Sequence, residues 1–131
     1  MKYNKKPTAA ELEILQVLWE EGPSSVRAVH EQLASTKDVF YTTILKTMQV
    51  MVGKKLLDRD TSQRSHIYKP LVEREETEHS MVNNLLNTVF GGSTSRLVIS
   101  ALGSGKPSAK ELEEIKSLIE KIDEDGVGER D

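Results

Sequence analysis

The chain has 131 residues, of which 37% are apolar and 30% are charged, as in globular proteins. Its apolar runs are all much shorter than the roughly 18 residues of a membrane span, so we expect a protein that is not embedded in a membrane. Its first residues, MKYNKKPTAAE, become acidic where a signal peptide would be apolar, and the absence of cysteine removes disulfides, thiolate zinc sites and a thiol nucleophile, which together predict a cytoplasmic protein. The net charge of −3 does not exclude a nucleic-acid partner, because residues 1–70 carry 11 Lys or Arg against 8 Asp or Glu, whereas residues 71–131 carry 7 against 13.

Three short helices are predicted at the start of the chain. The first follows the capping-box pair Thr8 and Glu11 and ends at Gly22-Pro23. Ser24 or Ser25 can cap the second, which ends near residues 34–36. The third runs from about Val39 to Gly53. Its apolar residues Ile44, Met48, Met51 and Val52 are expected to face inward, with Thr42, Thr43, Lys46 and Gln49 on the opposite side.

The hydrophobic period then changes to that of short strands. Residues 56–60 and 65–69 form two such runs around a turn at residues 61–64, which predicts a β-hairpin. Three helices followed by a hairpin is the order of a winged helix-turn-helix, whose third helix enters the major groove of DNA. We therefore predict a mainly α protein with a small β-hairpin, in which residues 1–70 form a winged-helix DNA-binding domain. The alternative is a small α+β domain with no nucleic-acid role.

Beyond Pro70 the pattern is helical again. One apolar stripe ends at Gly91-Gly92, a brief helix spans residues 94–102, and Ser108 with Glu111 begins a last helix with heptad spacing. These stripes are too wide for a domain of about 70 residues to cover, so residues 71–131 are predicted to be a helical dimerisation region. The alternative is a monomer with this cap folded back. The predicted dimerisation residues are Met81, Leu85, Leu86, Val89, Leu112, Ile115, Ile119 and Ile122.

Several polar side chains are candidates for contact with double-stranded DNA. Thr42, Thr43 and Lys46 lie on the exposed face of the third helix, where they can reach base edges in the groove. Tyr41 either contacts a phosphate through its hydroxyl or covers the edge of the core. The predicted phosphate clamps are Lys54, Lys55 and Arg64, of which Lys55 can equally be a solvated lysine.

No other constellation predicts chemistry. His30, His66 and His79 fall on three different predicted elements without metal-ligand spacing, so we expect no metal and no cofactor. Residues 103–106, Gly-Ser-Gly-Lys, lack the first glycine and the final Ser or Thr of a phosphate-binding loop and are predicted to be a linker. A small hydrolase would need a nucleophile beside a base, and the sequence offers no such pair. We therefore predict no catalytic residue and no small-molecule substrate. The alternative to a DNA-binding repressor is a winged-helix module for protein interaction.

The chain resembles the penicillinase-repressor family (BlaI/MecI/CopY) over roughly residues 7–122. The resemblance rests on the order and spacing of several segments. These are Tyr41-Thr42-Thr43-Ile44-Leu45-Lys46-Thr47, the Leu-Leu-Asp-Arg-Asp run at 56–60, Arg64 with Ile67-Tyr68-Lys69-Pro70, and Phe90-Gly91-Gly92. It implies a dimeric winged-helix transcriptional repressor that binds inverted repeats, that is, a palindromic operator, and is released by a signal.

The resemblance also implies how release could occur. In the beta-lactamase branch a membrane-bound sensor protease cuts an Asn-Phe pair, which falls on Ser100-Ala101 here, whereas the copper branch exchanges metal at C-terminal cysteines that this chain lacks. Two further departures are local. Gly53-Lys54-Lys55 replaces the usual Lys-Lys-Gly after the third helix, and Gln63 stands where the wing tip usually has glycine.

Overall fold

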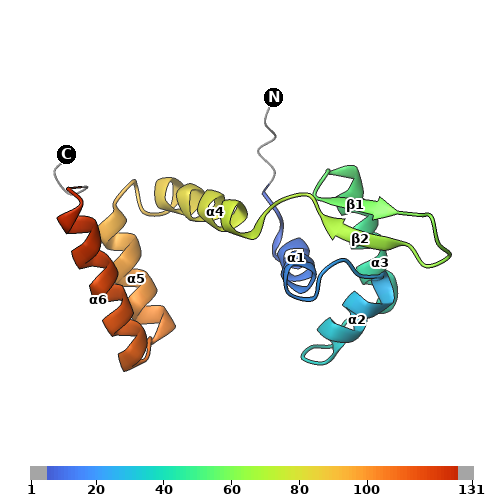
Figure 1. Cartoon of the computed structure of the whole chain (residues 1–131), viewed down its shortest axis with the longest axis horizontal. Coiled ribbons are helices and arrows are strands. Elements are labelled where there is room, and N and C mark those ends of the chain that lie inside the picture. The colour runs from blue at the N-terminus through green and yellow to red at the C-terminus, as the bar shows by residue number, and fades with distance from the viewer. Residues whose placement is uncertain (1–5, 127–131) are drawn as a thin grey trace. The chain divides into compact units, whose positions relative to one another are not determined.

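A computed structural model describes residues 6–126 and divides the chain into two compact units between Asn83 and Asn84. Each unit is described by itself (Figure 1). No helix within the described residues is long and apolar enough to cross a membrane.

The first unit begins with the predicted three helices. These are α1 (Ala9–Glu21), α2 (Val26–Ala34) and α3 (Tyr41–Gly53). The capping box of α1 is confirmed, because the Thr8 hydroxyl accepts from the Glu11 N–H at 3.2 Å while the Glu11 carboxylate accepts from the Thr8 N–H at 3.0 Å. Of the two candidate caps of α2, the structure selects Ser25, whose hydroxyl accepts from the Ala28 N–H.

The predicted β-hairpin follows these helices. Strands β1 (Leu57–Asp60) and β2 (Ile67–Pro70) pair antiparallel, with Leu57 opposite Pro70 and Asp60 opposite Ile67. Ser24 extends the sheet, since its N–H donates to the Tyr68 carbonyl at 3.0 Å and its carbonyl accepts from the Tyr68 N–H at 2.8 Å. The hairpin is thereby attached to the residues that lead into α2.

One hydrophobic core joins the three helices to the hairpin. Tyr68 from β2 is 2% exposed and packs with apolar residues of each helix. The other buried apolar residues are Ile14, Leu15, Val17, Leu18, Val26, Val29, Ile44, Met48, Met51, Leu56 and Leu57. Because Ile44, Met48 and Met51 point into this core, the opposite side of α3 is left to solvent, as the helical period predicts.

The third helix begins two residues later than its sequence pattern predicts. Phe40 is the N-cap, with an extended backbone at φ −87° and ψ 144°, and α3 starts at Tyr41. The Val39 carbonyl is bonded to His30 Nε2 at 2.9 Å, which holds this residue outside the helix. The His30 and Tyr41 rings also pack in a T-shaped arrangement, with centroids 5.7 Å apart, so the entry into α3 contacts α2.

The turn after α3 places a lysine in a left-handed conformation. Lys55 has φ +66°, at the position where the resembled family usually has glycine. By contrast, Gln63 at the wing tip has no positive φ, so the hairpin turn needs no glycine there. A left-handed conformation strains any residue with a Cβ and suits glycine.

We expect Lys55→Gly to stabilise the protein by about 0.5–1 kcal/mol, because relief of the strain exceeds the added chain entropy of glycine. Urea unfolding measures the change. Lys55→Ala is the matched control, since it removes the charge but keeps the strain, and its stability should equal that of the parent. Equal stability of the glycine and alanine variants would contradict the strain account.

The start of α4 (Arg74–Thr88) belongs to the first unit. The Trp19 indole N–H donates to the Val72 carbonyl at 3.0 Å, and the Arg74 guanidinium lies 5.7 Å from the Trp19 ring centroid. Thr77 is buried as well. The compact first unit therefore extends past the domain boundary at 70/71 that the sequence predicts, and it ends inside α4.

The second unit contains the end of α4 and two further helices, α5 (Thr94–Gly105) and α6 (Ala109–Glu124), between which the chain reverses direction (Figure 1). Ser93 and Ser108 cap them by accepting from the N–H of Arg96 and Glu111. The prediction of a linker at residues 103–106 is wrong for its first three residues. Helix α5 continues through Gly105, and Lys106 ends it in a left-handed conformation directly before Pro107, which cannot supply an N–H to prolong the helix.

Candidate nucleic-acid interface

The exposed face of α3 carries the polar residues that the helical period predicts. Thr42, Thr43, Lys46 and Gln49 are all exposed, while the apolar side of the helix is buried in the core. No side chain caps the N-terminus of α3, and Phe40 before it is 75% exposed. The leading end of this helix thus presents free backbone N–H groups, two hydroxyls and an aromatic ring.

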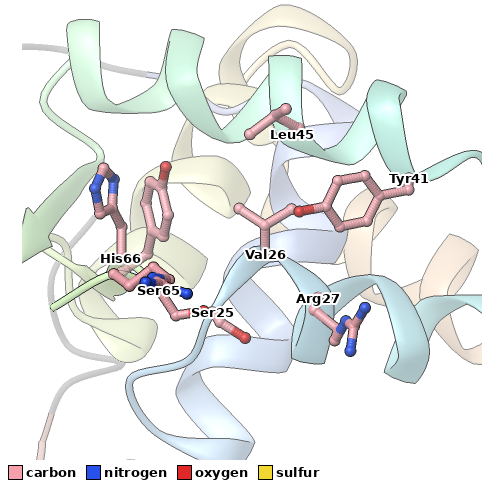
Figure 2. A pocket seen from close by; sticks show the side chains of 9 residues that line it. Ser25, Val26, Arg27, Tyr41, Leu45, Ser65 and His66 are labelled. Atoms are coloured by element: carbon pink, nitrogen blue, oxygen red, sulfur yellow. The ribbon is translucent and has the colours of Figure 1, made fainter. Parts of the chain in front are cut away.

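A pocket of about 380 Å³ opens on one side of α3. It lies between the start of α2, the first turns of α3 and the residues that lead into β2 (Figure 2). Tyr41 and Arg64, two of the predicted DNA contacts, are brought together here. The full lining is Ser25, Val26, Arg27, Tyr41, Leu45, Arg64, Ser65, His66 and Tyr68. None of these residues is acidic, although acidic residues outnumber basic ones in the chain as a whole.

A shallow groove of about 370 Å³ borders the other side of α3. Thr43, Lys46, Thr47 and Val50 line it from α3, opposite Thr8, Ala10 and Glu11 at the start of α1. The predicted contacts of α3 are therefore distributed around the helix. Tyr41 faces α2 and the hairpin, whereas Thr43 and Lys46 lie toward α1.

Lys54 has a partner within the protein. Its Nζ lies 2.7 Å from Oε2 of Glu11, whose side chain is only 5% exposed, so the pair ties the end of α3 to the start of α1. The other carboxylate oxygen of Glu11 accepts from the Thr8 N–H. Phosphate binding by Lys54 stays a prediction, and it would compete with this ion pair.

We expect Lys54→Ala to lower the free energy of unfolding by about 1–2 kcal/mol, because it leaves the buried Glu11 carboxylate without its cation. The expected loss is smaller than for a fully buried ion pair, because the Lys54 side chain is 41% exposed and solvent screens the interaction. Lys37→Ala is the matched control, because the Lys37–Glu13 pair at 3.0 Å is exposed on both sides and should contribute well under about 1 kcal/mol. Urea unfolding of both variants measures the difference, and equal losses would contradict a structural role for Lys54.

The remaining two predicted phosphate contacts are exposed. Lys55 follows the end of α3, and Arg64 lies in the loop between the strands. That loop is shaped at its start by Asp60, whose carboxylate accepts from the Ser62 N–H at 2.9 Å; this hydrogen bond lowers the pKa of Asp60. This hydrogen bond fixes the first residues of the loop that carries Arg64.

The second unit exposes a broad apolar surface. Neither α5 nor α6 has a buried residue. None of the eight predicted dimerisation residues is buried in the single chain; seven of them lie in this unit, and Met81 lies in the first. Leu85, Val89, Ile119 and Ile122 are 40%, 59%, 56% and 41% exposed. Ser100 and Ala101, the predicted cleavage position, are both exposed on α5.

Sequence reasoning missed several residues of the pocket. The sequence pattern predicts Ser25 only as a helix cap and His66 only as a histidine without metal-ligand spacing, and it does not single out Arg27; all three line the pocket. Arg27 lies in the first turn of α2, where a basic residue opposes the helix dipole, and that position is a signal that a sequence analysis could have used.

Known proteins resemble this chain over most of its length. A family described as the penicillinase repressor matches residues 7–121. The methicillin resistance regulatory protein MecI of Staphylococcus aureus is 25% identical over 87% of this chain and 93% of its own length. The penicillinase repressor of Bacillus licheniformis is 22% identical over 92% of this chain and 94% of its own length.

A solved structure supports the fold independently. A transcriptional regulator from Thermotoga maritima superposes with a TM-score of 0.50 at 22% identity and covers 92% of this chain and 79% of its own. The predicted fold class, a mainly α winged helix-turn-helix with a small β-hairpin, is confirmed. In this fold α3 occupies the position of the recognition helix and the β1–β2 hairpin that of the wing.

Proposed function

Because the chain belongs to the penicillinase repressor family, we propose that it represses transcription by binding palindromic promoter operators as a homodimer. The observation that carries this proposal is the exposed face of α3. Thr42, Thr43 and Lys46 are exposed on a helix whose opposite side is packed into the core of the first unit. In this proposal they read base edges, while Lys55 and Arg64 contact phosphates on either side.

The proposal of a homodimer is supported by the second unit. A helical unit without a buried residue in α5 or α6 lacks a core of its own, so its exposed apolar side chains need a partner surface. A second copy related by two-fold symmetry is the simplest partner. The two recognition helices of such a dimer would read two half-sites of an inverted repeat.

The proposed domain roles keep the division at 70/71 that the sequence pattern predicts, although the first compact unit extends to Asn83. We assign DNA binding to residues 1–70 and dimerisation to residues 71–131, with the first turns of α4 attached to the DNA-binding side through Trp19 and Arg74. Truncation at residue 70 would therefore also remove part of the first unit, so single substitutions in the full chain are the better test of dimerisation.

Release by a membrane-bound sensor protease is proposed by family likeness. The Ser100–Ala101 bond is exposed, but it lies within a continuous helix that extends to Gly105, so cleavage requires local unfolding of α5. The side chains of Ser100 and Ala101 are also small, so they give the specificity pocket of a protease little surface to contact. Expression in the native host under cell-wall stress, followed by mass spectrometry of fragments, tests this step. An intact chain that leaves its promoter would exclude proteolysis and indicate release by a bound ligand.

A mobility shift of a promoter fragment at two salt concentrations tests DNA binding itself. Neutralisation of several phosphates makes affinity fall steeply between 50 and 200 mM salt, by about tenfold for every two or so phosphates contacted. A winged helix that serves only protein interaction would give no shift at either concentration, and that result would refute the proposed function.

A further inference from the structure

Phe40, at the start of α3, is an aromatic side chain that the protein leaves uncovered. It is 75% exposed, the highest value among the large apolar side chains in residues 6–126. Its two neighbours are better covered, since Val39 packs against the core and the Tyr41 ring lies against His30. Water therefore surrounds a phenyl ring that contact with other apolar atoms would stabilise.

The backbone on both sides of Phe40 is held in place. His30 Nε2 is bonded to the Val39 carbonyl at 2.9 Å, and the Phe40 carbonyl accepts from the N–H groups of Thr43 and Ile44 at 3.1 and 3.2 Å. The ring thus projects from a fixed point, and only two side-chain bonds are left to rotate. An aromatic residue held in this way loses little conformational entropy when a partner covers it.

Phe40 also stands where a polar residue would stabilise the helix. The N-cap residues of α1, α2, α5 and α6 are Thr or Ser, and each accepts a hydrogen bond from a backbone N–H of the first turn. Phe40 is the N-cap of α3, and its side chain makes no such bond. A residue that neither caps its helix nor packs into the core, at a place where both are usual, is typical of a functional position.

The fold indicates which molecule would cover the ring. In a winged helix-turn-helix, the first residues of the recognition helix approach base edges in the major groove of DNA. Phe40 directly precedes these residues in α3, and its carbonyl is bonded to the N–H of Thr43, one of the proposed base contacts. The apolar group that the major groove displays is the C5 methyl of thymine, against which phenylalanine can pack.

We propose that Phe40 packs against the C5 methyl group of a thymine in each half-site of the operator and selects thymine over bases that lack this methyl. The inference rests on the proposed function and deepens it, because it names a base and the residue that reads it. Thr43 and Lys46 offer polar groups to base edges, whereas Phe40 adds an apolar contact beside them.

The test uses a duplex that the full-length parent chain selects from a randomised pool, in which each thymine is then replaced in turn by deoxyuridine. Deoxyuridine keeps the base pairing of thymine and lacks only the C5 methyl. Replacement of the contacted thymine should weaken binding of the parent about fourfold per half-site, the loss that corresponds to one buried methyl group. Equilibrium fluorescence anisotropy at constant salt measures the dissociation constants.

Phe40→Ser removes the ring and supplies a side chain that can cap α3. This variant should unfold at a higher urea concentration than the parent, so a change in its DNA binding is not due to loss of the fold. It should bind the thymine and deoxyuridine duplexes equally. Leu71→Ser is the matched control, because it removes a 52% exposed apolar side chain outside α3, and it should retain the fourfold preference for thymine.

The outcomes separate this inference from the proposed function. If the parent enriched no duplex from the pool, the proposed function would be refuted, and the inference with it. If the parent selected a duplex but no deoxyuridine replacement altered its affinity, the thymine contact would be refuted while DNA binding stood. The same conclusion would follow if Phe40→Ser kept the parent's preference for thymine, whatever its overall affinity.

Discussion

Ile119→Asp should convert the protein from a dimer to a monomer at micromolar concentration. Ile119 is 56% exposed in the single chain and lies in the heptad stripe of α6, so a carboxylate there costs the isolated chain little. In a two-fold dimer the substitution would bury two carboxylates at the interface without cations. We expect the dimer dissociation constant to rise by about 100-fold or more.

Sedimentation velocity measures this change, and Ser117→Asp is its matched control. The control adds the same charge to the same helix, but on its polar side, and should remain dimeric. Loss of the dimer should also lower operator affinity by roughly 100-fold, because each half-site is then bound alone. A parent chain that sediments as a monomer, or an Ile119→Asp variant as dimeric as the parent, would contradict the assigned interface.

Thr43→Ala and Lys46→Ala should each weaken operator binding by about 1–3 kcal/mol, or roughly 5- to 150-fold, with little effect on random duplex DNA. Both side chains lie on the exposed side of α3, and neither contributes to the core, so the fold should be unaffected. Competition of labelled operator with unlabelled random DNA measures the ratio of the two affinities. That ratio should fall for both variants.

Arg64→Ala should behave differently from the α3 variants. A phosphate contact gives affinity without sequence choice, so this variant should weaken operator and random DNA alike and lower the salt slope by about one. Lys110→Ala is the control, since it removes an exposed lysine at the start of α6 in the second unit. If Thr43→Ala and Lys46→Ala bound operator like the parent, the assignment of α3 as the reading helix would be wrong.

The local structure of this protein could be predicted well because its signals are local. The Thr8 and Glu11 capping box, the period of apolar residues in α3 and the change of period after Gly53 each involve residues close together in the chain. The start of α3 could not be placed as accurately. Its boundary depends on a hydrogen bond between His30 and Val39, which belong to different elements.

The candidate site was only partly predictable for the same physical reason. An exposed helix face follows from periodicity, but the Lys54–Glu11 pair joins residues 43 positions apart, and the pocket joins α2, α3 and β2. Gly103 and Gly105 suggested a linker because glycine weakens helices, yet each costs only about 1 kcal/mol there, and the helix ends instead at Lys106-Pro107. Propensity alone does not locate such an end.

Selection and footprinting of genomic fragments bound by the full-length chain tests the central claim most directly. A dimeric repressor should enrich a small set of promoter fragments and protect an inverted repeat. The half-site centres should lie about 10–10.5 base pairs, or a multiple of that, apart. Two chains should bind each duplex. Enrichment of no sequence over random DNA, or protection of a single half-site by one chain, would contradict the account.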